Sequence, residues 1–173
     1  IAEGELFLAC AGTTRHGIHF LDQAIAQGAA AVAVEPAAES AGLELSACPV
    51  PVFWVEDLHK LISEVAGRFY GNPSHEMSLV GITGTNGKTS VSQFIAQAIS
   101  EQAPCGVVGT LGSGLFGKLS ETGHTTPDAV TLQAELAQML DDGALHVAME
   151  VSSHALDQGR VNGLRFDVAV YTN

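Results

Sequence analysis

A glycine-rich segment, residues 81–90, has the residue types and spacing of a phosphate-binding turn. It reads Gly-Ile-Thr-Gly-Thr-Asn-Gly-Lys-Thr-Ser and lies between an apolar run and a stretch with helical periodicity. Glycines let the backbone turn its N–H groups inward, a helix start adds partial positive charge, and a lysine neutralises phosphate oxygens. We therefore predict that the segment binds a nucleoside triphosphate. The residues expected to contact it are Gly84, Thr85, Asn86, Gly87, Lys88, Thr89 and Ser90.

The segment departs in one place from the general phosphate-loop pattern, G-x-x-x-x-G-K-[ST]. Ile82 stands where that pattern has its first glycine. The alternative is a strand-to-helix turn with an incidental lysine, but the predicted strand before the segment and the helix after it favour nucleotide binding. Lys88 is expected to meet the β- and γ-phosphates and Thr89 to bind Mg²⁺. The reaction stays open, because kinases, GTPases and ligases share such loops.

Two series of alternating strands and helices are predicted to position this segment. Before it, apolar runs and helical periodicity predict strands at 6–10, 30–34 and 52–55 and helices at 19–27 and 58–69. From residue 79 onward, they predict strands at 79–83, 106–109, 146–151 and 167–170 and helices at 88–100 and 127–140, with a Gly-rich surface stretch up to Gly123. Near-continuous apolar strands separated by helices indicate an α/β fold with a mainly parallel sheet covered on both faces.

Glycine and proline cluster at residues 70–75, as they do in linkers and turns. We therefore predict two domains, residues 1–75 and residues 76–173. The chain begins without Met and ends directly after a predicted strand. A parallel strand is normally followed by a crossover, so we expect both domains to be truncated parts of a longer protein.

Composition and charge narrow the possible partners. The chain has 173 residues, 46% of them hydrophobic, and 19 acidic residues against 7 Lys and Arg give a net charge of −12. Such a surface repels a polyphosphate backbone, so no nucleic-acid partner is expected. No apolar run approaches the roughly 18 residues of a membrane helix and no signal peptide is recognisable, which predicts a cytoplasmic protein without membrane insertion. Three cysteines without a CxxC pair predict buried, inert thiols rather than disulfides or a zinc site.

Three motifs together resemble the Mur ligase family. They are Gly84–Thr89, then His124-Thr125-Thr126-Pro127-Asp128, then Met149-Glu150-Val151-Ser152-Ser153-His154-Ala155-Leu156-Asp157-Gln158-Gly159-Arg160-Val161. Residues 4–9 and 24–32 also resemble the family's UDP-binding domain, so the resemblance spans almost the whole chain. It implies a small N-terminal UDP-binding domain followed by a P-loop domain that uses ATP and Mg²⁺. The implied reaction adds meso-diaminopimelate or L-lysine to UDP-N-acetylmuramoyl-L-alanyl-D-glutamate through an acyl phosphate, in peptidoglycan synthesis.

The resemblance also implies roles for individual residues. Lys88 would act as a catalytic residue by holding the transferring phosphoryl group, and Glu150, also catalytic, would bind Mg²⁺ together with Thr89. Substrate contacts are implied for His124, Thr125, Thr126, Ser152, Gln158 and Arg160, and uridine-nucleotide contacts for Thr13, Thr14 and Arg15. A monomer is expected. The family's carbamylated lysine and C-terminal domain would follow residue 173, so the chain alone is expected to be inactive.

Plainer interpretations of several of these residues are available. In isolation, Glu150 would be a solvated carboxylate at a strand end, Arg160 would be a surface charge, and one threonine before Pro127 would merely cap a helix. His154 beside two serines suggests a hydrolase, but the segment lacks the G-x-S-x-G elbow. The other histidines have no metal-ligand spacing and are expected at the surface or in packing, namely His16, His19, His59, His75 and His146.

Two other functions are compatible with the phosphate-binding loop. Folylpolyglutamate synthetase, another member of the family, shares it, and a non-catalytic nucleotide-binding module would keep it as a scaffold. The motifs T-T-P-D and E-V-S-S-H-A-L-x-Q-x-R favour the muramoyl substrate. They leave the choice between diaminopimelate and lysine open.

Overall fold

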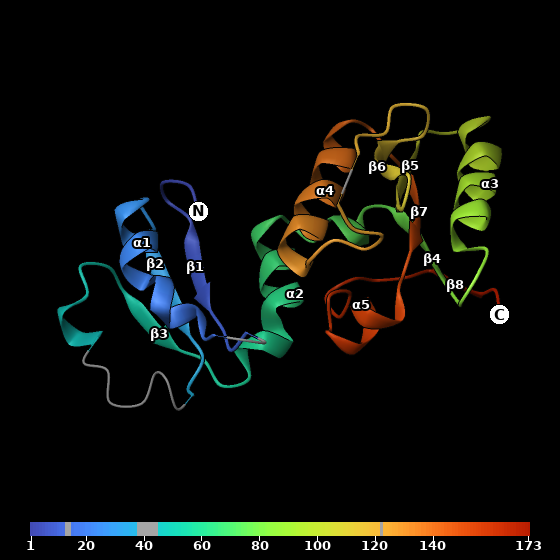
Figure 1. Ribbon diagram of the computed structural model, residues 1–173. Coiled ribbons are helices and arrows are strands. Elements are labelled where there is room, and N and C mark those ends of the chain that lie inside the picture. The colour runs from blue at the N-terminus through green and yellow to red at the C-terminus, as the bar shows by residue number, and fades with distance from the viewer. Residues whose placement is uncertain (13–14, 38–44, 122) are drawn as a thin grey trace. The chain divides into compact units, whose positions relative to one another are not determined.

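The protein divides into two compact units, Ile1–Ile62 and Ser63–Asn173 (Figure 1). The computed structural model describes residues 1–12, 15–37, 45–121 and 123–173. Thr13 and Thr14, two of the predicted uridine-nucleotide contacts, lie outside these ranges.

The first unit is built on a three-stranded parallel sheet. Its strands β1 (Leu6–Ala9), β2 (Ala31–Val34) and β3 (Val52–Trp54) pair in the order β1-β2-β3. Its helical segments are η1 (Gly17–Phe20), α1 (Leu21–Ala26) and η2 (Leu45–Ala47). The core between sheet and helices is made of Ala9, Ile18, Val32 and Val34. The three predicted strands are thus confirmed.

The helix predicted at residues 19–27 begins earlier and changes type along its length. Its first part is the 3-10 turn η1, where the His16 ring Nδ1 accepts a hydrogen bond from the Ile18 amide. His16 is buried with 1% of its surface exposed, so the expectation of a packing histidine is confirmed there. Only the following residues continue as the α-helix α1.

The second unit is an open α/β sheet with helices on both faces. Its helices are α2 (Leu58–Phe69), which begins in the first unit, η3 (Pro73–His75), α3 (Lys88–Ser100), α4 (Ala129–Asp141) and α5 (Ser153–Asp157). Its strands are β4 (Ser78–Thr83), β5 (Cys105–Gly109), β6 (Gly112–Leu115), β7 (His146–Glu150) and β8 (Val168–Tyr171). They pair in the order β6-β5-β7-β4-β8, and every pair is parallel except β5 with β6. The predicted, mainly parallel sheet is therefore confirmed.

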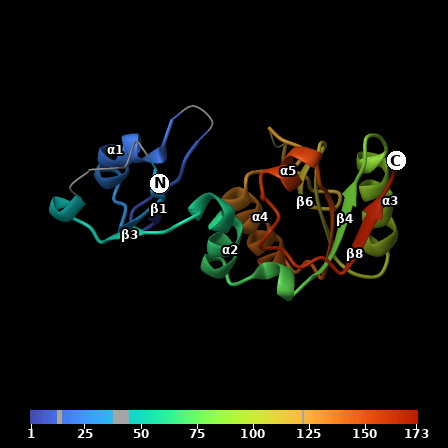
Figure 2. The ribbon, with the colours of Figure 1, turned by 90° about the horizontal axis from the view of Figure 1, so that it is seen from below.

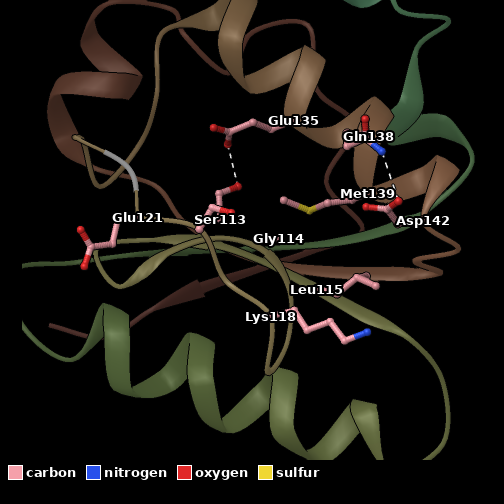
Figure 3. Close-up of a pocket in the computed structure, with 10 residues that line it drawn as sticks. Ser113, Gly114, Leu115, Lys118, Glu121, Glu135, Gln138, Met139 and Asp142 are labelled. Carbon is pink, nitrogen blue, oxygen red and sulfur yellow. Dashed lines mark hydrogen bonds between the residues drawn. The ribbon is translucent and has the colours of Figure 1, made fainter.

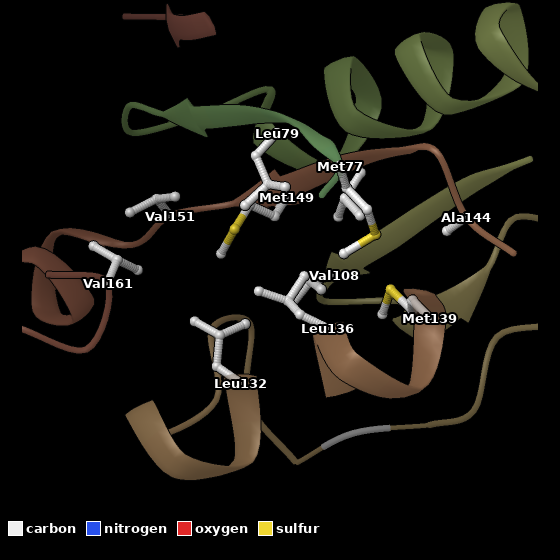
Figure 4. Close-up of a cluster of buried hydrophobic side chains, with 11 residues drawn as sticks. Met77, Leu79, Val108, Leu132, Leu136, Met139, Ala144, Met149, Val151 and Val161 are labelled. Carbon is white, nitrogen blue, oxygen red and sulfur yellow. The ribbon is translucent and has the colours of Figure 1, made fainter. Parts of the chain in front are cut away.

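Helices α3 and α4 cover opposite faces of this sheet, as Figure 2 shows. On the α3 side, Ala96 packs against Ile82 and Val107. On the α4 side, Leu132 and Leu136 point toward Leu79 and Met149 of the sheet (Figure 4). Because both faces are covered, the strands are apolar along nearly their whole length, which is the pattern that predicted them.

Three features of the second unit differ from the prediction. Strand β6 lies in the stretch predicted to be a Gly-rich surface loop, since its glycines give no alternating side-chain pattern to detect. Helix α4 begins two residues after Pro127, because the Asp128 carboxylate accepts the amide hydrogens of Val130 and Thr131 and so fixes the helix start. The short helix α5 was not predicted.

The division between the units falls within α2, earlier than the Gly/Pro cluster at residues 70–75. Ser63 explains why the later part of α2 belongs to the second unit. Its hydroxyl donates to the Arg160 carbonyl at 3.1 Å and accepts from the Gly163 amide at 2.9 Å. The predicted domains, residues 1–75 and 76–173, were divided at an expected linker, and the division into compact units does not test where a linker lies. These bounds therefore stay a prediction.

Replacing Leu136 with Ala should lower the free energy of unfolding by about 2–5 kcal/mol, because it removes a fully buried side chain and leaves a cavity. Urea denaturation followed by circular dichroism measures the change. Val130→Ala on the same helix is the matched control, since Val130 is 38% exposed and should cost much less. Equal losses in the two variants would contradict the packing of α4 against the sheet.

Candidate functional site

The predicted phosphate-binding turn joins the carboxyl end of β4 to the first residue of α3. Gly84 has φ +133° and Gly87, the N-cap of α3, has φ +84°. Both values lie in the region that residues with a Cβ rarely adopt. A Cβ at Gly84 would in addition overlap the Thr172 hydroxyl. The turn therefore requires glycine at both positions.

Lys88 folds its side chain back over the turn. Its Nζ donates to the Gly84 carbonyl at 2.6 Å and to the Thr85 carbonyl at 3.3 Å. The ammonium group consequently lies within the turn at the N-terminus of α3, where the partial positive charge of the helix adds to its own. From this position the Lys88 ammonium group could donate to phosphate oxygens in place of the Gly84 and Thr85 carbonyls.

Residues that follow β8 also hold the turn, and no sequence pattern pointed to them. The Thr85 amide donates to the Asn173 carbonyl at 3.0 Å, and the Asn86 amide donates to the Asn173 side-chain oxygen at 2.9 Å. The Thr172 hydroxyl donates to the Asn86 carbonyl at 2.6 Å. Because β8 is the neighbour of β4 in a parallel sheet, their carboxyl ends meet at one edge. That pairing, which follows from strand order, is the signal that would have located Thr172 and Asn173.

Glu150 ends β7, the other neighbour of β4, and its carboxylate is buried, with 1% of the residue's surface exposed. It accepts three hydrogen bonds: from the Thr89 hydroxyl at 2.9 Å, the Thr110 amide at 2.8 Å and the Thr110 hydroxyl at 3.3 Å. The interpretation of Glu150 as a solvated strand-end carboxylate is therefore wrong. A buried carboxylate is tolerated because these donors replace the water that it loses.

Gly109 makes room for this carboxylate, and its role was also missed from the sequence. A Cβ at Gly109 would overlap Oε1 of Glu150. Gly109 and Thr110 stand at the end of β5, which pairs with β7 in parallel, so they reach the same edge of the sheet as Glu150. An apolar strand that ends in Gly-Thr beside a strand that ends in Glu is the only sequence signal for them.

The hydroxyl of Thr89 and the carboxylate of Glu150 form a donor set of oxygen atoms only. Such a set fits a hard cation such as Mg²⁺, which prefers carboxylate, hydroxyl and water ligands. Thr89 is the residue after Lys88, so this pair of oxygens adjoins the turn that carries the lysine. The geometry thus brings together Lys88, Thr89 and Glu150 as the sequence predicted.

Several predicted substrate residues gather around the ends of β5 and β7. Thr126 is buried, and its hydroxyl donates to the Glu150 carbonyl at 2.8 Å and accepts from the Ser152 amide at 3.1 Å. The Ser152 hydroxyl caps α5 by accepting from the Ala155 amide. Thr126 and Ser152 therefore use their hydroxyl groups within the protein and position the neighbouring backbone. Thr125 is half-buried, and its hydroxyl lies 3.0 Å from that of Thr110.

Arg160 joins two of these segments instead of standing alone at the surface. Its Nη1 donates to the Thr126 carbonyl at 2.7 Å, and its Nε and Nη2 donate to the Gln158 side-chain oxygen at 2.9 and 2.7 Å. Gln158 and Arg160 are thereby brought to Thr126, although they lie far from it in sequence. Arg160 is half-buried and hydrogen-bonded to the Thr126 carbonyl, so it is not a fully solvated surface charge.

Asp128, and neither of the preceding threonines, caps α4. Burial alone would raise the pKa of the Asp128 carboxyl, but hydrogen bonds from the Thr131 hydroxyl and from the Thr131 and Val130 amides outweigh it and hold the pKa below its usual range. The cap is consequently ionised at neutral pH. The predicted possibility that Thr125 or Thr126 caps the helix is contradicted.

Among the described residues, at least two cavities border α4. One of about 290 Å³ is lined by His124, which is exposed, together with Gly123, Pro127, Asp128, Thr131 and Glu135. The other, of about 610 Å³, lies between β6 and α4 (Figure 3) and is lined by none of the predicted site residues. There burial raises the pKa of the Glu135 carboxyl, although the Ser113 hydroxyl donates to it at 2.7 Å.

In the first unit, Arg15 is exposed and follows Thr13 and Thr14, which lie outside the described residues, so the uridine-nucleotide contacts stay a prediction.

His59 of the first unit pairs with Glu35, a buried residue that follows β2. Burial acts to raise the pKa of Glu35, but hydrogen bonds from His59 and the Ala11 amide hold it below its usual value. Glu35, Asp57 and His59 form a cluster in which each offers one potential metal-ligand atom, and these atoms lie within 4.8 Å of one another. The spacing of the three residues in the sequence did not suggest this proximity. Asp57 itself pairs with Lys60 at 3.0 Å.

The three cysteines are free thiols. Cys105 is buried, and Cys10 and Cys48 are half-buried. Burial raises the pKa of Cys10 to about 12, with a further contribution from the charge of Glu35, and that of Cys105 to about 11. The thiols are unpaired, but the prediction that they are buried holds only for Cys105. At neutral pH Cys10 and Cys105 stay protonated and unreactive. Of the helices that the structure describes, none is both long and apolar enough to cross a bilayer.

Two family models match the chain. The model of the Mur ligase middle domain matches residues 82–173, and the model of the Mur ligase family catalytic domain matches residues 1–70. The first match includes the phosphate-binding turn, Glu150 and every residue of the second unit for which a substrate contact is predicted.

Similar proteins agree with these matches. A protein of Pseudomonas aeruginosa named UDP-N-acetylmuramoyl-L-alanyl-D-glutamate--2,6-diaminopimelate ligase is 53% identical over 174 residues, which cover all of this chain and 35% of that protein. A solved structure with the same enzyme name superposes with a TM-score of 0.82 at 34% identity, covering 100% of this chain and 34% of the other. The MurF ligase of Thermotoga maritima, solved in complex with ADP, has a TM-score of 0.53 at 21% identity over 88% of this chain and 30% of its own, which shows the fold. The chain spans about a third of the length of the curated relatives that it matches.

Replacing Gly109 with Ala should weaken the binding of a Mg²⁺-nucleotide complex by roughly tenfold or more, because the added methyl group displaces the Glu150 carboxylate. Calorimetric titration with a non-hydrolysable ATP analogue, with and without Mg²⁺, measures the effect. Gly123→Ala is the control, since nothing lies within 4 Å of a Cβ at that position. If the two variants bind the complex equally well, the assigned role of Gly109 is wrong.

Proposed function

The chain belongs to the Mur ligase family, and we propose that it is the N-terminal and central part of an ATP-dependent ligase that joins meso-diaminopimelate to UDP-N-acetylmuramoyl-L-alanyl-D-glutamate. The observation that carries this proposal is the contact between Thr89 and Glu150 beside Lys88. The choice of substrates is supported by the names of relatives that are about half identical to this chain. The motif around Thr125 and Thr126 favours the same muramoyl substrate.

In this proposal, the turn between β4 and α3 binds the triphosphate of ATP. The amides of Thr85 and Asn86, which donate to Asn173 in this structure, and the Lys88 ammonium would contact phosphate oxygens, with Gly84 and Gly87 providing the backbone shape. Thr89 and Glu150 would hold Mg²⁺ directly or through water. When bound, Mg²⁺ would neutralise phosphate charge during transfer. For the phosphates to reach the Thr85 and Asn86 amides, those amides must release Asn173.

The substrate carboxyl group would lie on the Thr125 side of Glu150. Its oxygen would take up the γ-phosphoryl group of ATP with release of ADP, which gives an acyl phosphate. The amine of the incoming amino acid would then attack the acyl carbon, release phosphate, lose a proton and form the amide bond. The protein's contribution is to position these groups and to neutralise charge. Thr125 and His124 would contact the substrate directly, whereas Thr126 and Ser152 hold the neighbouring backbone. Arg160 would complete the site together with Gln158: it donates to the Thr126 carbonyl and to the Gln158 side-chain oxygen, which holds the backbone at Thr126.

We further propose that Thr13, Thr14 and Arg15 contact the uridine nucleotide in the first unit. The diamino acid would be selected outside these 173 residues, and turnover would require the rest of the ligase. The protein would act as a cytoplasmic monomer, a location that the free cysteines support.

Lys88→Ala should reduce the affinity for a Mg²⁺-ATP analogue by roughly ten- to a hundredfold in the full-length ligase, because it removes a charged hydrogen-bond donor from the phosphate site. Equilibrium titration measures the affinity. Lys118→Ala is the control for loss of one positive charge, since Lys118 lies on the hairpin of β6 and away from the turn. Unchanged affinity in a folded Lys88→Ala protein would favour the non-catalytic module.

The substrate class has its own test in the same protein. UDP-N-acetylmuramoyl-L-alanyl-D-glutamate should raise the melting temperature, because a ligand that binds only the folded state stabilises it. A folate with a glutamyl tail should not. The reverse pattern would assign the chain to the folylpolyglutamate branch of the family.

A further inference from the structure

Thr110 lies at a turn that gives it contact with both halves of the proposed site. Strands β5 and β6 pair up to Gly109 and Gly112, so Thr110 and Leu111 form a two-residue hairpin turn. The turn directs the Thr110 amide and hydroxyl to the Glu150 carboxylate at 2.8 and 3.3 Å. The same hydroxyl lies 3.0 Å from the Thr125 hydroxyl. Thr110 thus connects the carboxylate proposed for Mg²⁺ with the threonine proposed for the substrate.

Counting protons fixes the direction of these hydrogen bonds. An ionised carboxylate only accepts, whereas a hydroxyl has one proton to donate and can also accept. The Thr110 hydroxyl must therefore donate to Glu150, and the Thr125 hydroxyl donates to Thr110. Each bond polarises the next, so the chain Thr125 to Thr110 to Glu150 is held in one direction by the negative charge at its end. In this state the Thr125 proton is occupied.

We propose that Thr110 is a positioning residue that couples the nucleotide-metal side of the site to substrate binding by reversing this hydrogen-bond chain. The inference rests on the proposed function. A cation that takes up the charge of Glu150 weakens the attraction on the Thr110 proton, which then turns to Thr125. Thr125 is left with its own proton free to donate to an anionic group of the substrate. Binding on one side thereby strengthens binding on the other, and the coupling is reciprocal.

Two substitutions at Thr110 separate the hydroxyl from the backbone contact. Thr110→Val removes the hydroxyl at nearly constant shape, and Thr110→Ser keeps it. Both retain the amide that donates to Glu150. Leu111→Ala in the same turn, where Leu111 is 59% exposed, controls for disturbance of the hairpin.

The measurement is the dissociation constant of UDP-N-acetylmuramoyl-L-alanyl-D-glutamate for the full-length ligase, with and without Mg²⁺ and a non-hydrolysable ATP analogue. In the unmodified protein and in Thr110→Ser and Leu111→Ala, the analogue should tighten substrate binding by roughly tenfold, the effect of one hydrogen bond to a charged group. In Thr110→Val the ratio of the dissociation constants measured without and with the analogue should fall to about one, whatever the affinity without the analogue. Thr125→Val should also abolish the tightening of substrate binding by the analogue. Combining Thr110→Val with Thr125→Val should not reduce that tightening further.

The outcomes are distinguishable. A Thr110→Val protein that keeps the full gain overturns the coupling role. Equal weakening with and without the analogue would assign Thr110 a merely structural role and would also overturn it, as would an unmodified protein that binds the substrate with no gain. An unmodified protein that does not bind the UDP-dipeptide at all would instead refute the proposed function.

Discussion

The site depends on one constraint, the burial of the Glu150 carboxylate. A charge withdrawn from water needs hydrogen-bond donors or a cation, and without them burial would cost several kcal/mol. The protein supplies the Thr89 hydroxyl from the helix that follows the turn and both donors of Thr110 from the hairpin. Gly109 must lack a side chain for the carboxylate to fit. Residues far apart in sequence are thus tied to one charged group.

The parallel sheet explains how these residues meet. Strands β4, β5, β7 and β8 run in the same direction, so the segments that follow them emerge at one edge. That edge collects the phosphate-binding turn, Thr110, Glu150 and Thr172, each from a different strand. Ligands of open α/β folds bind at such edges. The helices that cover the two faces keep the strands in register, which links packing in the core to geometry at the site.

Local patterns in the sequence predicted the local features well. The turn could be located because strand, glycines, lysine and helix are consecutive, and the helix that follows it has the predicted bounds Lys88–Ser100. Strand β6 escaped prediction because glycine contributes no periodic signal. Gly109, Thr110 and Thr172 escaped because their importance comes from contacts across the sheet, which a single sequence does not encode in its spacing. Thr126 was predicted to contact the substrate, but its burial and its hydrogen bond to the Glu150 carbonyl show that its hydroxyl serves the protein backbone.

The most direct test is a crystal structure of the protein with Mg²⁺ and a non-hydrolysable ATP analogue. We predict phosphate oxygens at Lys88 in place of the Gly84 and Thr85 carbonyls. We also predict a cation about 2.1 Å from the Thr89 hydroxyl, with Glu150 as a direct or water-mediated ligand. A triphosphate bound elsewhere, or a cation without a direct or water-mediated contact to Glu150, would contradict this assignment.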